Sequence, residues 1–287
     1  MVRWRLVPVF VSLLTAATLA TPTADAPASP VLLSGGTVFQ FNTFGNSGPG
    51  KHFNAPIAQD VLNSVDARSP MPFAITLEEM CFPTVASLAA STGLRAPSRN
   101  YTAINWYLPV SVGTNPDGTY CGSFGNFVAI RGTATGSPDL GQYSVQSGEI
   151  RSWICLAISS TSPYRLVCST HLKNSDVTTA SWQLFEFLGH LNLFLLRQMW
   201  GADLNLNSIP GQPDYASGLG TTFCNYGFVE AELGVCSPVG QTSTMMKSPP
   251  RKYDYGGFKT PGFTVSPPPR INASAHSDHR ILEGFAS

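Results

Sequence analysis

The feature that most constrains this chain is a set of apolar, strand-like segments that end in an acid, an amide or a histidine. The segment Gly201-Ala202-Asp203-Leu204-Asn205-Leu206 is the clearest example, because an acid and an amide follow an apolar run two residues apart. If the run is a strand, alternation sends Asp203 and Asn205 to the same side, where they could hold a metal-bound water beside a phosphate. An Asp-x-Asn sequence in a turn also commonly caps the local backbone.

Other strand-like segments end in the same way. The alternating run 37–44 contains Asn42, and the apolar run 72–77 continues directly into Glu78 and Glu79. Taken singly, such residues are often turn caps, solvent-facing charges or structural histidines. The polar residues at these strand ends are Asn42, Glu79, His171, Asp203, Asn205, Asp254, Asp278 and His279. A carboxylate among them is a natural oxygen ligand for magnesium.

Length and charge limit the possible partners. The chain has 287 residues, enough for one large domain or two small ones. Charged residues make up 12% of it, against about 25% in typical soluble domains, and 17 basic residues balance 17 acidic ones. This balance gives no support to tight nonspecific binding of nucleic acid, although it leaves room for a nuclease that grips a few phosphates.

The N-terminus has the pattern of a secretory signal peptide. Two arginines precede the short apolar core 6–20, and the Ala-x-Ala sequence at 24–26 matches a cleavage site. We therefore predict a signal peptide over 1–26, a flexible lead-in over 27–35 and a folded domain over 36–287. A retained membrane anchor is the alternative, and no second hydrophobic span follows. The predicted protein is secreted or extracytoplasmic, monomeric, and without a stable membrane span after cleavage.

Six cysteines suit an exported protein and allow many pairings. The strand-like runs 152–158 and 164–170 flank a Ser/Thr/Pro turn, so a hairpin would place Cys155 and Cys168 opposite each other. Pairing the remaining sequence neighbours predicts Cys81–Cys121 and Cys224–Cys236, although the sequence leaves other pairings open. No Cys-x-x-Cys occurs, so cysteine ligation of a metal is not indicated.

The other elements follow from periodicity and capping. We predict helices over 54–66, from Pro83 to about Gly93, and from the N-cap Ser175-Asp176 to near His190. We predict further strands over 101–110, 126–131, 193–200 and 253–255, with a last one after His279. Residues 207–260 are rich in Gly, Pro, Ser and Thr, which predicts long loops around short strands.

In chain order, these segments resemble the endonuclease/exonuclease/phosphatase superfamily, which has the deoxyribonuclease-I-like fold. The resemblance extends from about residue 36 to 287. It is carried by Phe41-Asn42-Thr43-Phe44-Gly45-Asn46, Leu77-Glu78-Glu79-Met80-Cys81, Gly125-Asn126, Ser169-Thr170-His171-Leu172, Gly201-Ala202-Asp203-Leu204-Asn205, Tyr253-Asp254-Tyr255 and Ser277-Asp278-His279.

The resemblance implies an α/β (α+β) fold, a four-layer sandwich of two packed mixed β-sheets flanked by helices, with the site where strand ends converge. It also favours ending the third helix near His190, which periodicity alone leaves open. The departures from the family pattern are Ala202 in place of Gly, Glu78 in place of Gln, Arg197 and Gln198 in a strand expected to be buried, and Gly256-Gly257 after Tyr255.

The implied activity is Mg²⁺- or Mn²⁺-dependent hydrolysis of a phosphodiester, with a nucleic acid as the preferred substrate. Glu79, helped by Asn42, would hold the metal ion. Asp278 would hold a second ion or support the first. Glu78 is the alternative to Glu79 as the ligand.

The implied catalytic residues are five. Asp203 would orient the attacking water, and Asn205 would donate to a phosphate oxygen. His279, oriented by Asp254, would be the general base. His171 would donate to the phosphate or protonate the leaving group.

Two other functions remain open at this point. The first is a sphingomyelinase, another phospholipase-C-type enzyme or a phosphoinositide phosphatase, which should expose apolar loop residues, for which the loops offer Phe258 and Phe263. The second is a non-catalytic binding or toxin-like module on the same fold. The full set of acids, amides and histidines argues against a silent module.

Overall fold

The computed structural model describes residues 36–43, 55–111, 121–158, 165–194, 197–237, 239–246, 248–266, 269–273 and 277–286. The predicted signal peptide and lead-in lie outside these residues, as do Phe44, Gly45 and Asn46 of the first family-like segment. Among the helices that are described, none is long and apolar enough to span a bilayer.

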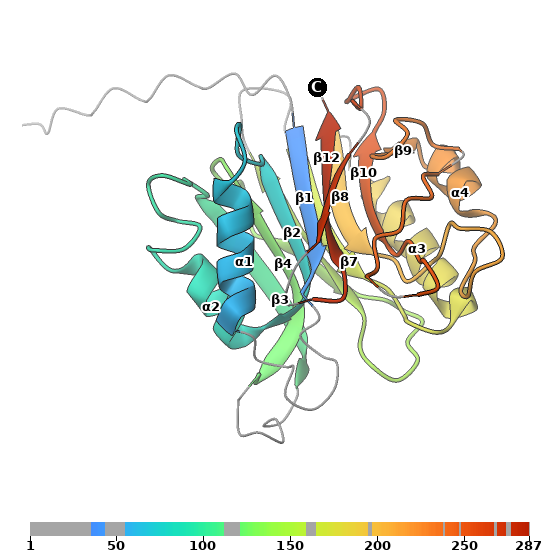
Figure 1. The fold of residues 1–287 in the computed structure, drawn as a ribbon, viewed down its shortest axis with the longest axis horizontal. Helices are drawn as coiled ribbons and strands as arrows, with labels where there is room; N and C mark the ends of the chain where they lie inside the picture. Colours follow the sequence, from blue (N-terminus) through green and yellow to red (C-terminus); the bar gives the residue numbers. More distant parts are fainter. Residues whose placement is uncertain are drawn as a thin grey trace, which may run out of the picture. The chain divides into compact units, whose positions relative to one another are not determined.

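In the part of the chain that the structure describes, twelve strands form two six-stranded sheets (Figure 1). The first has the order β11-β12-β1-β2-β4-β3, with β1 (Gly36–Asn42), β2 (Ala74–Cys81), β3 (Ala103–Ser111), β4 (Ser123–Ile130), β11 (Arg270–Ala273) and β12 (Arg280–Ala286). The second has the order β5-β6-β7-β8-β10-β9, with β5 (Asp139–Gln142), β6 (Ser152–Ile158), β7 (Arg165–His171), β8 (Arg197–Asp203), β9 (Phe228–Glu230) and β10 (Asp254–Lys259). Both sheets are mixed, because β1 and β2 are parallel, as are β7 and β8.

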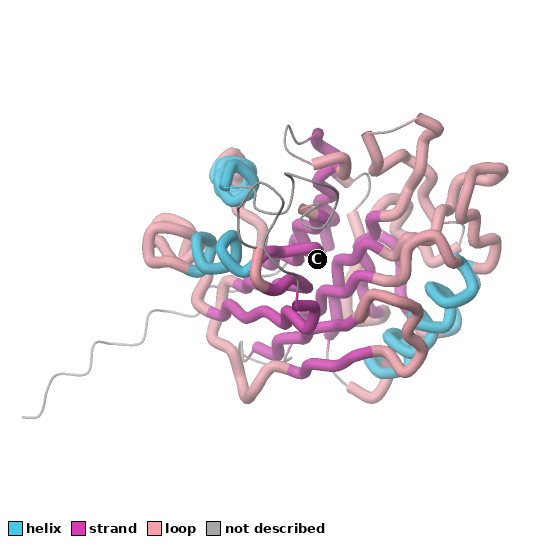
Figure 2. The backbone as a smooth tube through the Cα atoms, turned by 90° about the horizontal axis from the view of Figure 1, so that it is seen from below, coloured by secondary structure: helices cyan, strands magenta, loops and turns pink. Residues whose placement is uncertain are grey.

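The four helices among the described residues cover the outer faces of the two sheets (Figure 2). These are α1 (Ala55–Asp66), α2 (Phe82–Ala89), α3 (Val177–Leu191) and α4 (Leu219–Asn225). Val61 of α1 and Leu88 of α2 share a buried cluster with Phe39 of β1, whereas Phe187 of α3 packs with Trp200 of β8. A third apolar cluster lies between the sheets. The predicted four-layer sandwich is confirmed.

Alternation along each strand assigns side chains to these layers. In β1, Phe39 and Phe41 pack toward the helices, whereas Val38 belongs to the cluster between the sheets. In β8, Trp200 packs toward α3 and Met199 faces the other sheet. The inward residues that follow are polar, which builds the site described below.

The predicted break between the third helix and β8 is confirmed. The polar Gln198 is tolerated in this buried strand because its side chain has hydrogen-bond partners at the end of that helix. Helix α3 ends at Leu191 and β8 begins at Arg197. The buried Gln198 side chain donates to the carbonyl oxygens of Leu191 and Phe194 at 2.7 and 2.8 Å, so it satisfies acceptors at the helix end.

The second glycine after Tyr255 is explained by a close contact. Gly257 pairs with Trp200 across the β8–β10 ladder, and a Cβ on Gly257 would overlap the Trp200 indole. The strand predicted over 253–255 therefore continues to Lys259.

Several boundaries differ from the sequence prediction. Helix α2 ends at Ala89 rather than near Gly93, and β4 begins three residues before Asn126. The segment 207–260 contains α4, which was not predicted because Gly and Thr dilute its apolar pattern. The short strands β5 and β11 were also missed.

The expectation that Phe258 and Phe263 lie on exposed loops is wrong. Phe258 is fully buried on β10, Phe263 is 4% exposed, and their rings pack 5.7 Å apart. All three predicted disulfides are present, namely Cys81–Cys121, Cys155–Cys168 and Cys224–Cys236. Cys155 and Cys168 are direct partners in the β6–β7 hairpin.

Candidate active site

The layer between the sheets becomes polar along its strands. In β1, the inward positions carry Val38, Gln40 and Asn42 in succession, and in β8 they carry Met199, Gly201 and Asp203. A Cβ on Gly201 would overlap Thr76 and would lie 2.7 Å from Gln40 Cβ, so glycine allows the two sheets to approach here. The two-residue period of the strands therefore brings Asn42 and Asp203 together across the layer.

A bulge in β2 separates the two adjacent glutamates. The pairing of β2 with β4 shifts between Leu77 and Met80, and Glu79 adopts a φ of 54°. The carbonyl oxygens of Glu78 and Glu79 both accept from Thr43 Oγ1, at 2.9 and 3.1 Å, which pins the bulge to the end of β1. Glu79 lines the cavity described below, whereas Glu78 is fully buried.

Glu78 belongs to a hydrogen-bonded network between the sheets. Its carboxyl accepts from Gln40 at 2.9 Å and from Ser169 at 2.8 Å, and the same Gln40 amide donates to Asp254 at 2.8 Å. Burial, followed by the charges of Asp254 and Asp203, raises the pKa of Glu78 well above its ordinary value even though both hydrogen bonds lower it. Glu78 thus faces the interior and contacts the site through Gln40.

Asp203 and Asn205 show both features expected from the sequence, because Asp203 caps the local backbone and both side chains line the cavity described below. Asp203 ends β8, its Oδ1 accepts from the backbone N–H of Asn205 at 2.9 Å, and its Oδ2 accepts from Asn42 Nδ2 at 2.7 Å. Strand alternation is not what brings Asn205 to the site, because Asn205 lies beyond the strand with a φ of 51°. This turn places its amide 2.9 Å from His171 Nε2.

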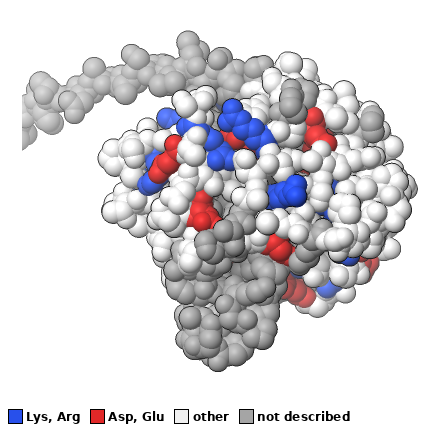
Figure 3. All heavy atoms as spheres, viewed as in Figure 1, with Lys and Arg blue, Asp and Glu red and all other residues white. Residues whose placement is uncertain are grey.

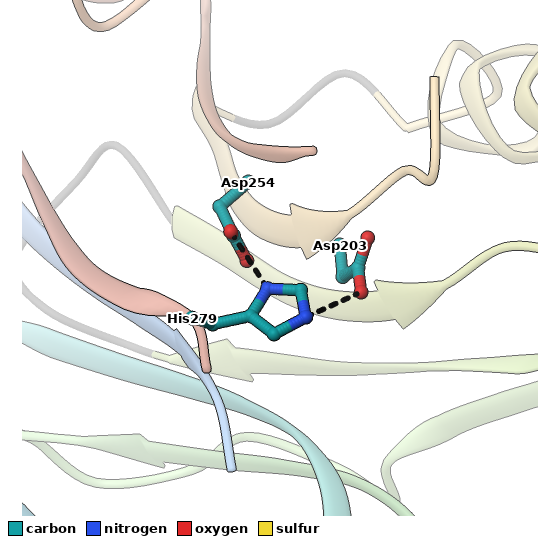
Figure 4. Close-up of side chains that lie close together, drawn as sticks. All are labelled: Asp203, Asp254 and His279. Carbon is teal, nitrogen blue, oxygen red and sulfur yellow. Dashed lines mark hydrogen bonds and ion pairs between the residues drawn. The ribbon is translucent and has the colours of Figure 1, made fainter. Parts of the chain in front are cut away.

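His279 lies between two carboxylates (Figure 4). Its Nδ1 is 2.9 Å from Asp254 Oδ2, and its Nε2 is 3.8 Å from Asp203 Oδ2 and 3.9 Å from Asp278 Oδ1. Burial alone would lower the pKa of His279, but the neighbouring carboxylates of Asp254, Asp203 and Asp278 raise it to about 10. Burial raises the pKa of Asp203 to about 7, with His279 opposing the rise and Asp254 adding to it. In the protein without a bound cation, His279 is therefore protonated at neutral pH.

His171 is in the opposite electrostatic state. Burial lowers its pKa well below the ordinary value, and the charges of Arg151 and His279 lower it further. Arg151 Nη1 lies 2.6 Å from Nδ1 and 3.1 Å from Nε2, and Asn205 Nδ2 lies 2.9 Å from Nε2, so protein donors face both ring nitrogens. Nε2 also lies 3.4 Å from Asp203 Oδ2 and 3.7 Å from Glu79 Oε1. His171 is a neutral imidazole whose Nε2 lies close to these carboxylates.

The predicted residues converge on one cavity of about 230 Å³. Its lining includes Glu79, Glu149, Arg151, His171, Asp203, Asn205, Asp214, Met245, Arg251, Tyr253, Asp278 and His279. Asn42 and Asp254 are fully buried behind it, hydrogen-bonded to Asp203 and His279 respectively. All eight predicted site residues thus form one connected group, six of them in the cavity wall.

The lining is chemically suited to a divalent cation. Its carboxylates, from Glu79, Glu149, Asp203, Asp214 and Asp278, outnumber its two arginines. An anionic substrate would be repelled by this excess unless a cation were bound, and hard oxygen donors are the ligands that Mg²⁺ prefers. Asp203, Asp254 and His279 also offer ligand atoms within 4.8 Å of one another, but both Asp254 oxygens already accept hydrogen bonds.

Sequence reasoning missed Arg151, Arg251 and Tyr253. Arg151 was detectable in principle, because it immediately precedes the apolar strand that was expected to pair with the His171 strand. Tyr253 begins a recognised segment, but only Asp254 of that segment was assigned to the site, and Arg251 gave no comparable signal because it lies in the loop-like region before that segment. Ser277, by contrast, lies in a recognised segment, and its Oγ donates to the carbonyl oxygen of Asn42 at 2.9 Å.

Comparison with known proteins gives a consistent result at the level of structure. No family model and no curated sequence matches the chain. An endonuclease/exonuclease/phosphatase from Beutenbergia cavernae superposes with a TM-score of 0.64 at 17% identity, over 88% of this chain and 71% of that one. D. rerio TDP2 complexed with single strand DNA product gives 0.62 at 11% identity, over 88% and 99%. Sphingomyelinase C from Streptomyces griseocarneus gives 0.58 at 15% identity, over 88% and 98%.

These similarities agree with two packed mixed sheets flanked by helices. The chain therefore has the fold of the endonuclease/exonuclease/phosphatase proteins, and that fold is the deoxyribonuclease-I-like sandwich.

Proposed function

We propose that this protein is a secreted, metal-dependent phosphodiester hydrolase, with nucleic acid as the preferred substrate. The observation that carries the proposal is one cavity into which four strand ends bring six polar residues and whose lining carries more carboxylates than arginines. Phosphodiester hydrolysis needs a cation near the phosphate, an oriented water and a proton donor for the leaving oxygen, and this lining offers a residue for each.

We assign the cation to Glu79 and Asp278, with Asn42 behind them. A bound Mg²⁺ or Mn²⁺ would supply positive charge to the phosphate. Asn42 Nδ2 lies 3.4 Å from Glu79 Oε1 and 2.7 Å from Asp203 Oδ2, so it holds the carboxylates of Glu79 and Asp203 in place. Glu78 is a poor alternative ligand because it is fully buried and occupied by Gln40 and Ser169.

The remaining residues act on the water and the phosphate. Asp203 orients the attacking water, and Asn205 and His171 donate to phosphate oxygens. Arg151, held beside His171, adds fixed positive charge. His279 is fixed by Asp254, and it serves as the base once the charge of a bound cation offsets the carboxylates that keep it protonated. The alternative role of His171 is to protonate the leaving oxygen instead of donating to the phosphate.

Secretion is supported by the N-terminal pattern and by the three disulfides, which persist in oxidising compartments. Because the chain has few charged residues and no formal net charge, we expect the substrate to be held by local contacts to its phosphates rather than by long-range attraction. On the face in Figure 3, basic and acidic side chains are interspersed within a largely uncharged surface.

A second candidate is a sphingomyelinase or related phospholipase-C-type activity. With Phe258 and Phe263 buried, its support comes from the outer face of α3, where Trp182 is 61% exposed and Phe185 is 40% exposed, with rings 6.1 Å apart. An enzyme that acts at a lipid surface needs such exposed aromatic residues.

Hydrolysis of bis-p-nitrophenyl phosphate by the mature domain, with Mg²⁺, Mn²⁺ or EDTA, tests the proposal. We expect metal-dependent turnover that is lost in His279→Ala and retained in His190→Ala, a matched substitution at a histidine on α3 outside the cavity. Plasmid DNA and sphingomyelin then separate the two candidates. Absence of turnover on all three substrates by a folded sample would favour the non-catalytic module.

A further inference from the structure

A chain segment that the sequence did not assign to the site forms one wall of the cavity. Residues 239–246 and 248–253 precede β10 and are hydrogen-bonded on both sides of His279. Met246 N–H donates to the Asp278 carbonyl at 2.8 Å, and Arg280 N–H donates to the Thr244 carbonyl at 2.7 Å. The wall is therefore fixed relative to the reacting groups.

Arg251 is held firmly in this wall. Its carbonyl accepts from the backbone N–H groups of Thr244 and Met245 at 3.0 and 3.1 Å. Its Nη1 donates to the Tyr253 hydroxyl at 3.0 Å, and that hydroxyl donates to Asp214 Oδ2 at 2.5 Å. The guanidinium also lies over the Tyr253 ring, 5.8 Å from its centroid.

The Tyr253 hydroxyl keeps Arg251 from being neutralised in a close ion pair. Arg251 Nη1 is 3.9 Å from Asp214 Oδ2, longer than a bidentate arginine–carboxylate contact. Within the described part of the chain, Nε and Nη2 of Arg251 make no hydrogen bond. The Arg251 side chain is 32% exposed at the cavity, so these donors are accessible to a ligand.

The sheet order places the two arginines of the cavity on opposite sides of its centre. Arg151 precedes β6 and Arg251 precedes β10, and these strands flank the β7–β8 pair that carries His171 and Asp203. Three strand spacings separate β6 from β10, roughly 14 Å. Arg151 already contacts His171 and Glu149, whereas Arg251 lies away from His171.

We infer that Arg251, positioned by Tyr253 and Asp214, binds a second phosphate group of the substrate, next to the one that is hydrolysed. This deepens the proposed function and rests on it. A single phosphodiester is served by the centre and Arg151, so an additional fixed cation on the far side suits a substrate with phosphates in series. A zwitterionic lipid headgroup, which carries one phosphate, gains nothing from it.

Calorimetric titration tests the inference without depending on turnover. The wild-type domain with Mg²⁺ is titrated with thymidine 3′,5′-bisphosphate and with thymidine 5′-monophosphate. We expect the bisphosphate to bind about tenfold more tightly, the effect of one partly exposed charge-assisted contact. Arg251→Gln should abolish most of this ratio, Tyr253→Phe should reduce it, and Arg95→Gln, at an exposed arginine outside the cavity, should preserve it.

A parallel titration with inositol 1,4-bisphosphate and inositol 1-phosphate identifies the source of the second phosphate. Equal affinity for both members of each pair, or a ratio that survives Arg251→Gln, would overturn the inference. Arg251→Lys keeps the charge and should retain part of the ratio, which covers the case in which Arg251→Gln does not fold. Turnover of bis-p-nitrophenyl phosphate in the same samples reports separately on the proposed function, because active enzyme without the ratio fails only the inference.

Discussion

The two ends of the layer between the sheets use the same strands for opposite purposes. At one end, Val38, Val167, Met199 and Phe258 are buried against one another and stabilise the sandwich. At the other end, the inward positions of the same strands carry Asn42, His171, Asp203 and Asp254, which are just as buried. Burying these polar groups costs stability unless each finds a partner, so the polar end is held together by hydrogen bonds that also fix its reactive geometry.

Glu78 and Glu79 sharpen the comparison most, because the bulge sends one residue to the interior and its neighbour to the cavity. Glu79→Gln should lower kcat/KM by about 100- to 1,000-fold, since metal–phosphate contacts contribute several kcal/mol to the transition state. Glu78→Gln keeps the shape, and its carbonyl oxygen can accept from Gln40 while its amide donates to Ser169 Oγ, so it should lower kcat/KM by less than about tenfold. Steady-state kinetics with Mg²⁺ measures both. Equal losses would mean that the interior network, rather than the cavity carboxylate, is essential.

Met199→Ala tests the apolar end. Removing this fully buried side chain should reduce the free energy of unfolding by about 2–5 kcal/mol, because it leaves a cavity between the sheets. Urea denaturation measures the loss. Activity per folded molecule should stay within about twofold of wild type, and a large loss of activity in the folded variant would show that the two ends are coupled.

Gly201→Ala tests the boundary between the two ends. The added methyl would overlap Thr76 and crowd Gln40, so we expect a loss of about 1–3 kcal/mol in the free energy of unfolding. Ala202 on the outer face provides the contrast, because Ala202→Gly removes a methyl group rather than forcing the sheets apart. If Gly201→Ala were neutral, the close approach at this point would not be required.

Individual strands were predictable because period-2 alternation is a local feature, whereas the four-layer architecture was predicted from the family resemblance that the ordered strand-end segments carry. The sequence predicted the three disulfides partly from local features, since Cys155 and Cys168 lie on adjoining strands. It did not predict the contacts of Gln40, whose side-chain amide donates to both Glu78 and Asp254, because the three residues lie far apart in the chain. Arg251 was missed because its place depends on a loop folding back over His279, a tertiary contact without a local pattern.

The pH dependence of stability, a loss of at most about 1.4 kcal/mol for each pH unit, separates the charged end from the apolar one. The pKa of His279 in the folded protein is raised to about 10, so its stabilising contribution is complete below its ordinary pKa of about 6.5 and is lost as pH rises toward 10. Between pH 7 and 9.5, in EDTA, the free energy of unfolding should therefore fall, by at most about 1.4 kcal/mol per pH unit. His171 contributes little in this range, because its lowered pKa leaves it neutral in the folded protein and the range lies above its ordinary pKa of about 6.5 in the unfolded chain.

Urea denaturation at several pH values measures this slope, with His279→Gln as the variant that should flatten it. Met199→Ala should shift the whole curve down and keep the slope, because it removes apolar contacts and no charge. Mg²⁺ should stabilise the wild type more at pH 9 than at pH 7, since the cation competes with the His279 proton for the same carboxylates. If the free energy of unfolding changed with pH as steeply in His279→Gln as in the wild type, the titrating group would not be His279. The difference between the two ends would then lie in their hydrogen bonds and not in the charge of His279.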